Sequence, residues 1–413
     1  MEILKAFRFR LEPDEVQERF CQQTAGSCRF LKNLCLEQRS RAYARGKHQI
    51  HYKMQSKELS GLKEMLPWLA EAPSQVLQQA MMDLEKAFQR FFDKVADYPT
   101  FQKKGERDSF RFPQGFEVDE ANHRIKFPKM GWVSYRPGRG KSARKIHGEV
   151  RSINVGREGD HWFASILCKM AVSTPPAVHG FAVGADLGVA KAIALSTGEV
   201  LEVLGMTKAE QKKLAKLQQA MAKKKRFSKN WQKLKRRIAR LHSTVARRRR
   251  DSINKATTYL AKNHRLIVIE DLRVKNMTRA PKPKADPDQE GSFLPNGAAA
   301  KAGLNRVVLD KGFGEIRRQL DYKHVWYGSL LLAENPAYTS QKCSECGHTE
   351  ADNRKTQDRF VCLKCGHAEN ADTNASKNIL SAGLLTERTV GHTGVKKEAT
   401  PLRRPAKNRK PAA

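Results

Sequence analysis

Alternation of apolar and polar residues near the start of the chain predicts a β-strand over residues 5–11. Phe7, Phe9 and Leu11 fall on one face of this strand, and arginines fall on the other. Pro13 then opens a segment of helical periodicity that runs to about residue 95, because proline suits the first turn of a helix. Its clearest apolar stripe has helical spacing and comprises Leu77, Met81, Leu84, Phe88 and Phe91. We interpret this stripe as the core of a helical bundle.

Short alternating runs, interrupted by glycine and proline, predict β-structure between about residues 107 and 170. Residues 156–160 predict the turn of a hairpin that joins the last two of these strands. Residues 173–176, Ser-Thr-Pro-Pro, indicate a linker and a domain boundary. The helical segment is therefore predicted to be inserted into a small β-domain whose first strand is residues 5–11.

The second half of the chain alternates strand patterns with helical ones. In order, it predicts a strand–turn–strand unit over 181–200, long basic helices over 208–262, a fully buried strand over 266–269, a mobile loop over 276–304, a helix over about 306–326, an apolar run at 330–332 and a short helix from about 372. Residues 386–413 are basic and rich in proline at their end, and we expect them to be disordered.

The composition narrows the class of partner. The chain has 413 residues, with 78 Lys and Arg against 43 Asp and Glu, a formal net charge of +35. Its length predicts two or three domains. The charge favours polyanionic partners and argues against an ordinary neutral metabolic enzyme. The sequence shows neither a secretory leader nor a run of 18 apolar residues, so we expect an intracellular protein that does not span a membrane.

Much of the positive charge lies between residues 221 and 250, which contain fourteen Lys or Arg and no acid. An apolar seam in the same segment predicts a packed helix with a basic outer face. A solvated charged face is the ordinary interpretation of such a run, but repulsion here favours neutralisation by phosphate. The candidate nucleic-acid-binding residues are Lys223, Lys224, Lys225, Arg226, Lys233, Arg236, Arg237, Arg240, Arg247, Arg248, Arg249 and Arg250.

Four of the eight cysteines form the pattern C-x₂-C-x₁₅-C-x₂-C: Cys343, Cys346, Cys362 and Cys365. This spacing predicts one structural Zn²⁺ held by four thiolates, with disulfide pairing as the alternative. Gly347 and Gly366 follow the two pairs, where a residue free to adopt positive φ is useful. The other four cysteines, Cys21, Cys28, Cys35 and Cys168, are interpreted as small buried hydrophobic residues.

Three acids occupy unusual positions. Asp186 lies in a strand that otherwise reads as buried, Glu270 ends the apolar strand 266–269, and Asp372 lies at a helix start just after the cysteines. A charge in or at the end of a buried strand is costly unless it is paired. One interpretation is that the first two acids form salt bridges and that Asp372 is an N-cap. The other is that the three acids together hold metal ions.

Jointly, the three acids resemble the catalytic set of RNase H-like nucleases of the RuvC type. The chain also contains, in order, the motifs Asp-Leu-Gly at 186–188, Ile-Glu-Asp-Leu at 269–272, Phe-Gly-Glu at 313–315, Tyr-Lys at 322–323, Tyr-Gly at 327–328, Thr-Ser-Gln-Lys-Cys-Ser-Glu-Cys-Gly at 339–347 and Asn-Ala-Asp-Thr-Asn-Ala at 370–375. With these motifs in this order, the chain resembles the TnpB family, the transposon-encoded proteins of the IS200/IS605 group, which are compact relatives of type V CRISPR effectors. The resemblance is specific from 181 to 380 and looser before that. Many relatives carry Asp where this chain has Asn370.

The resemblance implies a multidomain α+β and α/β fold. Its parts are a β-barrel-like wedge domain (1–12 and 106–176), an inserted helical recognition module (13–105), a RuvC-like nuclease domain (177–336 and 369–385), an inserted zinc ribbon (337–368) and a basic tail (386–413). It also implies an RNA-guided DNA endonuclease in which Asp186, Glu270 and Asp372 hold two catalytic Mg²⁺ ions. The expected partners are a transposon-end guide RNA and double-stranded DNA carrying a short adjacent motif, with a companion transposase as a further possibility. A monomer on its RNA, in the prokaryotic cytoplasm or nucleoid, is expected.

Ser74, Gln75, Gln78 and Gln79, at the start of the predicted recognition helix, are candidates for reading the adjacent motif, because amides can contact base edges. An ordinary polar helix face is the alternative interpretation for each of them. Two other functions stay open at this point: a DNA- or RNA-binding regulator of transposition that does not cleave, and a transposase that acts directly on DNA ends. The retained acids favour cleavage over regulation.

Overall fold

The computed structural model describes residues 1–392 except 47, 107, 139–144, 288 and 290. The described chain forms two compact units, Met1–Ser173 and the part from Thr174 onward, and the boundary coincides with the predicted linker. The basic tail from 393, with its expected disorder, lies outside the described residues. Within the described part, no helix is both long enough and apolar enough to cross a membrane.

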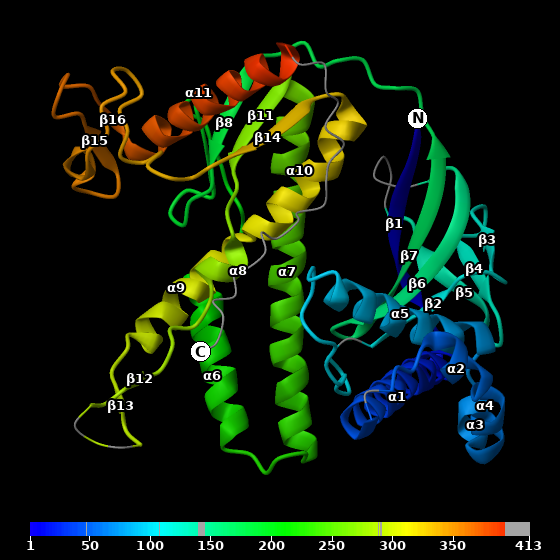
Figure 1. The fold of residues 1–413 in the computed structure, drawn as a ribbon. Helices are drawn as coiled ribbons and strands as arrows, with labels where there is room; N and C mark the ends of the chain where they lie inside the picture. Colours follow the sequence, from blue (N-terminus) through cyan, green and yellow to red (C-terminus); the bar gives the residue numbers. More distant parts are fainter. Residues whose placement is uncertain (47, 107, 139–144, 288, 290, 393–413) are drawn as a thin grey trace. The chain divides into compact units, whose positions relative to one another are not determined.

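The first unit contains a curled antiparallel sheet in the order β2-β6-β7-β1-β5-β4-β3 (Figure 1). Its strands are β1 (Glu2–Glu12), β2 (Ser109–Phe112), β3 (Glu117–Asp119), β4 (Arg124–Phe127), β5 (Gly131–Arg136), β6 (Glu149–Glu158) and β7 (His161–Ala171). The rings of Phe112 and Phe127 lie 4.8 Å apart although four strands separate β2 from β4 in the sheet order. The sheet is therefore a half-barrel closed over an aromatic core, which agrees with the predicted β-domain.

Among the described residues between β1 and β2 there are five helices: α1 (Glu15–Gly46), α2 (Tyr52–Lys57), α3 (Leu59–Met65), α4 (Pro67–Ala70) and α5 (Ser74–Phe92). The predicted stripe of α5 is buried at Leu77, Met81, Leu84 and Phe88. The cysteines of α1 are buried and form no disulfide, and burial raises the pKa of the Cys21 thiol to about 12. Both features confirm the helical bundle predicted from the sequence, and the helices share one core with the sheet.

The second unit is built on a mixed sheet in the order β10-β9-β8-β11-β14. The strands are β8 (Ala182–Asp186), β9 (Ile193–Leu195), β10 (Val200–Leu201), β11 (Leu266–Glu270) and β14 (Leu330–Glu334). β11 runs parallel to both β8 and β14, whereas β8, β9 and β10 pair antiparallel. The carboxyl ends of β8 and β11 therefore meet at one edge of the sheet.

The helices of this unit are α6 (Lys208–Ala222), α7 (Lys229–Asn263), α8 (Val274–Met277), α9 (Ala298–Lys311), α10 (Phe313–Tyr327) and α11 (Ala371–His392), and a small hairpin joins β12 (Lys284–Ala285) to β13 (Phe293–Leu294).

Three sequence predictions need correction here. The supposed loop 276–304 contains these short elements and the start of α9. The single helix expected over 306–326 is two helices, because Gly312 adopts φ +72 and ends α9. The last helix continues to His392, so residues 386–392 are helical.

Helices cover both faces of the mixed sheet. The apolar residues of α7 and α10 pack on one face, and those of α11 pack on the other through Ile379. Two glycines allow α11 to lie very close to the strands: a Cβ on Gly184 would collide with the backbone of Ser376, and one on Gly383 would collide with Val268. This close packing places the first turn of α11 next to the end of β8.

Candidate carboxylate site, cysteine cluster and basic helices

Three acids converge at the edge where the parallel strands end. Asp186 is the last residue of β8 and Glu270 is the last residue of β11, one step beyond the paired residues Ala185 and Ile269. Asp372 occupies the first turn of α11, which packs on β8. The structure thus brings together the three acids that the sequence singled out.

The electrostatics of Asp186 reflect this convergence. Burial, followed by the charges of Glu270 and Asp372, raises the pKa of Asp186 from 3.8 to about 7. Burial also raises the pKa of Glu270, and a hydrogen bond from Thr339 Oγ1 to Glu270 Oε1 (2.8 Å) partly opposes that shift. The site therefore holds mutually repelling carboxyl groups that a cation would stabilise.

Two basic residues that the sequence did not single out face the same site. Arg354 Nη2 lies 3.5 Å from Asp372 Oδ1, and Lys191 Nζ lies 4.0 Å from Asp372 Oδ2. The charge of Arg354 also lowers the pKa of Asp186, against the larger effect of burial. Arg354 belongs to the cysteine-containing module and Lys191 to a loop after β8. Neither motif spacing nor periodicity in the sequence indicated these two residues.

The donor set fits a hard divalent cation. Three carboxylates from β8, β11 and α11 supply the oxygen ligands that Mg²⁺ prefers, and such an ion would offset the repulsion around Asp186. The fit is incomplete in one respect. Within the described chain, the four cysteines are the one group of three or more metal-binding side chains whose ligand atoms all lie within 4.8 Å of one another. The three carboxylates are neighbours, but their oxygen atoms do not all lie within 4.8 Å of one another.

The four cysteines form a much tighter cluster. Cys343 and Cys365 have their Sγ atoms 3.7 Å apart, and those of Cys346 and Cys362 are 3.6 Å apart. Tetrahedral zinc with bonds of about 2.3 Å requires sulfur separations of about 3.8 Å, so the cluster fits Zn²⁺. The four thiols are free cysteines, which excludes the disulfide alternative in this structure.

The two cysteine turns are built alike. Gly347 N donates to Cys343 O, and Gly366 N donates to Cys362 O, each at 3.0 Å. Both glycines have positive φ, +73 and +75, which confirms the role expected for them. A 3₁₀ turn, η2 (Ala351–Arg354), and a small hairpin of β15 (Arg359–Val361) and β16 (Ala368–Asn370) complete the module.

Amide side chains of α11 attach this module to the carboxylate site. Asn374 Nδ2 donates to Lys342 O (2.8 Å) and its Oδ1 accepts from Ser344 N (2.9 Å). Asn378 Nδ2 donates to the carbonyl oxygens of Thr339 (2.9 Å) and Lys342 (2.6 Å). Both asparagines lie within two helical turns after Asp372, so the cysteine module and the third acid are held on one rigid element. The sequence analysis missed these two residues.

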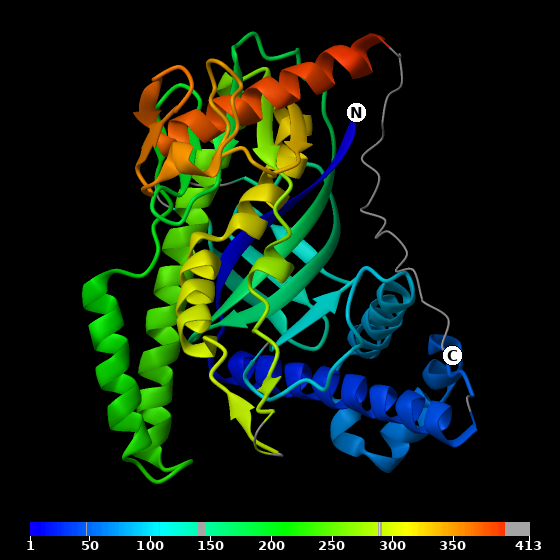
Figure 2. The same cartoon turned by 60° about the vertical axis from the view of Figure 1, so that its left-hand side comes forward.

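The predicted basic helices are α6 and α7, which lie side by side as a hairpin (Figures 1 and 2). Ten of the twelve candidate basic residues are exposed, and Arg248 and Arg249 are the two half-buried ones. Arg248 donates to Glu210 at 2.6 and 3.0 Å, and Arg249 pairs with Asp310. The acid-free segment is thus neutralised in part by acids from other helices, so these two arginines already have protein partners.

The candidate motif-reading residues do not share one environment. Ser74, Gln75 and Gln78 are exposed at the start of α5. Gln79 is only 8% exposed and donates to Asp83 Oδ1 (3.2 Å), because it lies on the inner face of the helix. The prediction that Gln79 presents its amide to DNA is therefore corrected, and it stays a prediction for the other three.

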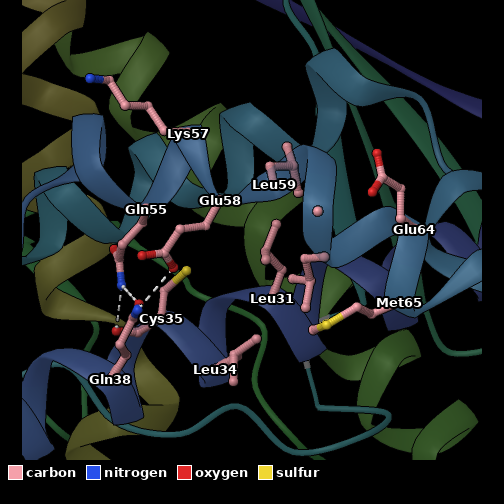
Figure 3. Close-up of a pocket in the computed structure, with 12 residues that line it drawn as sticks. Leu31, Leu34, Cys35, Gln38, Gln55, Lys57, Glu58, Leu59, Glu64 and Met65 are labelled. Carbon is pink, nitrogen blue, oxygen red and sulfur yellow. Dashed lines mark hydrogen bonds between the residues drawn. The ribbon is translucent and has the colours of Figure 1, made fainter.

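A groove of about 710 Å³ lies between α1 and the helices α2 and α3 (Figure 3). Leu31 and Met65 contribute apolar surface to it. Its amides already bond within the protein: Gln55 Nε2 donates to Cys35 O (3.0 Å) and to Gln38 Oε1 (2.7 Å). These contacts fix the packing of the helices on one another.

The two units define a class: a strongly basic protein with a carboxylate cluster on a mixed sheet and a four-cysteine module docked beside it. Three family models match the chain. "Probable transposase" (OrfB_IS605) matches residues 165–280, "Cas12f1-like, TNB domain" matches 313–379 and "Helix-turn-helix domain" matches 1–48. The described part of the last range consists of β1 and the single helix α1.

Relatives match nearly the whole chain. "Putative RNA-guided DNA endonuclease InsQ" of Escherichia coli (strain K12) is 44% identical over 385 residues, which covers 93% of each chain. "Putative RNA-guided DNA endonuclease" of Streptomyces pristinaespiralis is 30% identical, covering 93% of this chain and 90% of the relative. The chain therefore belongs to the TnpB family of the IS605 group. A solved "Cas12f1-sgRNA-target DNA complex" aligns with 92% of this chain and 100% of its own, at 17% identity and a TM-score of 0.31.

Proposed function

We propose that this protein is a transposon-encoded, RNA-guided DNA endonuclease. The proposal is supported by its 44% identity with InsQ over almost the full length of both chains, and by the name that relative carries. The observation that carries the chemistry is the convergence of Asp186, Glu270 and Asp372 at one edge of the mixed sheet, where burial and the two neighbouring acids raise the pKa of Asp186. Buried carboxylates that repel one another are characteristic of sites that bind divalent cations.

In this proposal Asp186, Glu270 and Asp372 hold two Mg²⁺ ions. A bound pair of this kind supplies activation of water and stabilisation of the leaving oxygen of a phosphodiester. The sheet order β10-β9-β8-β11-β14, with its parallel and antiparallel halves, supports an RNase H-like domain of the RuvC type. In this proposal Thr339, through its hydrogen bond to Glu270 Oε1, fixes the orientation of the Glu270 carboxylate.

The cysteine module serves as a structural zinc ribbon in this proposal. The sulfur separations of 3.6 and 3.7 Å support Zn²⁺ with no open position for water. The hydrogen bonds from Asn374 and Asn378 to the ribbon backbone support a second role, which is to keep the first turn of α11 in place. Folding of the ribbon and placement of Asp372 are then coupled.

The exposed cations of α6 and α7 are proposed to bind the phosphates of guide RNA, whereas Arg248 and Arg249 are paired with Glu210 and Asp310 of the protein. Base pairing with the guide supplies most of the sequence specificity in such a system, and the protein reads a short adjacent motif. Ser74, Gln75 and Gln78 are exposed on α5 and are proposed to contribute to that reading.

The test is a cleavage assay with the purified protein bound to its own transposon-end RNA, Mg²⁺ and a matched plasmid. Wild type should cut beside the motif, and Asp186→Asn should bind the plasmid without cutting it. Asp321→Asn is the matched control, because Asp321 is an exposed acid of α10 in the same unit. Cleavage by Asp186→Asn would contradict the carboxylate assignment. A wild type that binds but never cuts would indicate a regulator, and specific cutting without RNA would indicate a direct transposase.

A further inference from the structure

The loop between α6 and α7 displays an aromatic ring among cations. Phe227 is 66% exposed, and the four residues before it, Lys223–Arg226, are all basic and exposed. Exposing a large aromatic ring to water is unfavourable, and the charged residues around it would not pack it into a protein core. Single exposed rings are nevertheless common on protein surfaces, and what distinguishes Phe227 is the run of four exposed cations directly before it.

The backbone of this loop is held in place although it is strained. Phe227 adopts φ +67, a left-handed conformation that a bulky residue rarely takes. Ser228 N donates to Lys225 O (3.1 Å), and Ser228 Oγ accepts from Trp231 N (3.2 Å) as the cap of α7. Gln232 Nε2 donates to Phe227 O (2.9 Å). These hydrogen bonds thus hold the backbone of Phe227 in an unfavourable conformation, and strain of this kind is concentrated at functional sites.

The Phe227 ring belongs to a small cluster of aromatic and cationic side chains. The rings of Phe227 and Trp231 lie 5.6 Å apart, edge to face. The Arg226 guanidinium lies 5.0 Å from the Phe227 ring, and Lys235 Nζ lies 5.4 Å from the Trp231 ring. A flat π-surface beside several cations has the chemistry that single-stranded nucleic acids meet on proteins, where bases stack on rings and phosphates pair with Lys or Arg.

We propose that Phe227 is a stacking platform for an unpaired nucleobase, either of the guide RNA or of a displaced strand of target DNA. The inference rests on the proposed function and adds to it a contact that charge does not provide. Bases inside a duplex have both faces covered by neighbouring bases, so an exposed ring on the protein selects a base that is splayed out. The opposite end of α7 packs on the mixed sheet near Ile253, about 40 Å away at 1.5 Å per residue, so this contact is remote from the carboxylates.

The first measurement is the affinity of the whole protein for fluorescently labelled guide RNA, over a series of salt concentrations. Phe227→Ala should weaken binding by about tenfold or more, as loss of one stacked base does. The slope of log K against log salt should stay the same, because no phosphate contact is lost. Lys224→Ala should instead reduce the slope by roughly 0.7, the value for one charge on a single strand.

Two further variants separate the ring from the backbone. Phe227→Gly removes the ring and also relieves the strain of the positive φ, so it should bind RNA as weakly as Phe227→Ala. Phe227→Tyr keeps an aromatic ring, so it should bind RNA as tightly as wild type. Phe293→Ala is the matched control, because Phe293 is also 66% exposed, on β13. Equal binding by wild type, Phe227→Ala and Phe227→Gly would remove guide RNA as the source of the base.

A second arm measures capture of target DNA by the preformed protein–RNA complex. A defect of Phe227→Ala in this arm alone assigns the stacked base to the displaced DNA strand. Normal RNA binding and normal DNA capture by Phe227→Ala would overturn the inference. That outcome is distinct from failure of the proposed function, because in the latter case wild type itself would not capture the matched DNA with its RNA.

Discussion

Replacing Asp186 by asparagine is expected to stabilise the metal-free protein while it abolishes cleavage. Burial and two neighbouring acids raise the pKa of Asp186 from 3.8 to about 7, a difference of about 3 units. At about 1.4 kcal/mol per unit, the ionised carboxylate destabilises the folded state by about 4 kcal/mol. A buried amide in its place costs about 1–3 kcal/mol if its hydrogen bonds are incomplete. The net gain is therefore expected to be about 2 kcal/mol.

The gain should depend on pH in a defined direction. The folded-state pKa of Asp186 lies above its unfolded value, so the folded protein binds more protons between pH 3.8 and about 7. The free energy of unfolding of wild type is therefore highest, as far as Asp186 is concerned, below pH 3.8. It falls as the pH rises to about 7 and Asp186 becomes ionised in the folded protein. Asp186→Asn lacks this loss, so its advantage should be absent near pH 4 and complete at pH 8.

Amide hydrogen exchange is the suitable assay, because a chain with two units need not unfold in one step. The protein–RNA complex is kept in EDTA and potassium chloride, and exchange is followed in peptides from β8 and β11. A gain of about 2 kcal/mol corresponds to about 30-fold slower exchange at pH 8, after correction for the intrinsic rate. Peptides from β6 and β7 in the other unit provide the internal reference.

Adding Mg²⁺ gives the complementary result. The ion should slow exchange of β8 in wild type, because a ligand that binds only the folded state stabilises it, and should have much less effect on Asp186→Asn. Equal exchange of wild type and variant at pH 8, or an advantage that is the same at pH 4 and pH 8, would refute the reasoning. Either outcome would mean that Asp186 is not held in a repulsive carboxylate cluster.

Other perturbations test other parts of the structure. Cys362→Ser should lose bound zinc, measured by atomic emission, together with cleavage; full activity without zinc would break the coupling of ribbon and Asp372. Asn374→Ala should reduce cleavage severalfold while zinc content stays at one ion per chain, because only the link to α11 is removed. Burial lowers the pKa of Lys323 from 10.5 to about 8, so the unfolded chain binds more protons between these values and stability should rise with pH across that window. Lys323→Met should flatten that rise in exchange of α10, and an unchanged pH dependence would contradict it. RNA affinity of wild type should fall steeply with salt, and a shallow slope in the same titration would show that α6 and α7 make few phosphate contacts.

Much of the architecture could be predicted from local patterns. The alternation of Phe7, Phe9 and Leu11 predicted β1, and the stripe of α5 proved to be buried as expected. Strand and helix have periods of two and 3.6 residues, so a run of apolar residues reveals both the element and its inner face. The cysteine spacing likewise predicted the cluster, because each pair fits within one turn of known geometry.

The site was predictable only in part. Asp186, Glu270 and Asp372 stood out because each is a charge where the surrounding pattern is apolar or begins a helix, and the structure brings them together. The family resemblance, rather than the physics of each acid alone, joined them into one set. Arg354 and Lys191 had no such signal, since a basic residue in a loop is ordinary in a chain with 78 of them.

What the sequence determined by itself was therefore the type of most major elements, the surplus of positive charge and the cysteine turns, because these depend on neighbours along the chain. The tertiary structure decided which groups are paired. Arg248 and Arg249 form ion pairs with Glu210 and Asp310, which are distant from them in the sequence. Gln79 became buried while Gln78 stayed exposed, because the packing of α5 selects one face. Free energies of pairing and burial depend on which groups meet in space, and that is settled only when the chain folds.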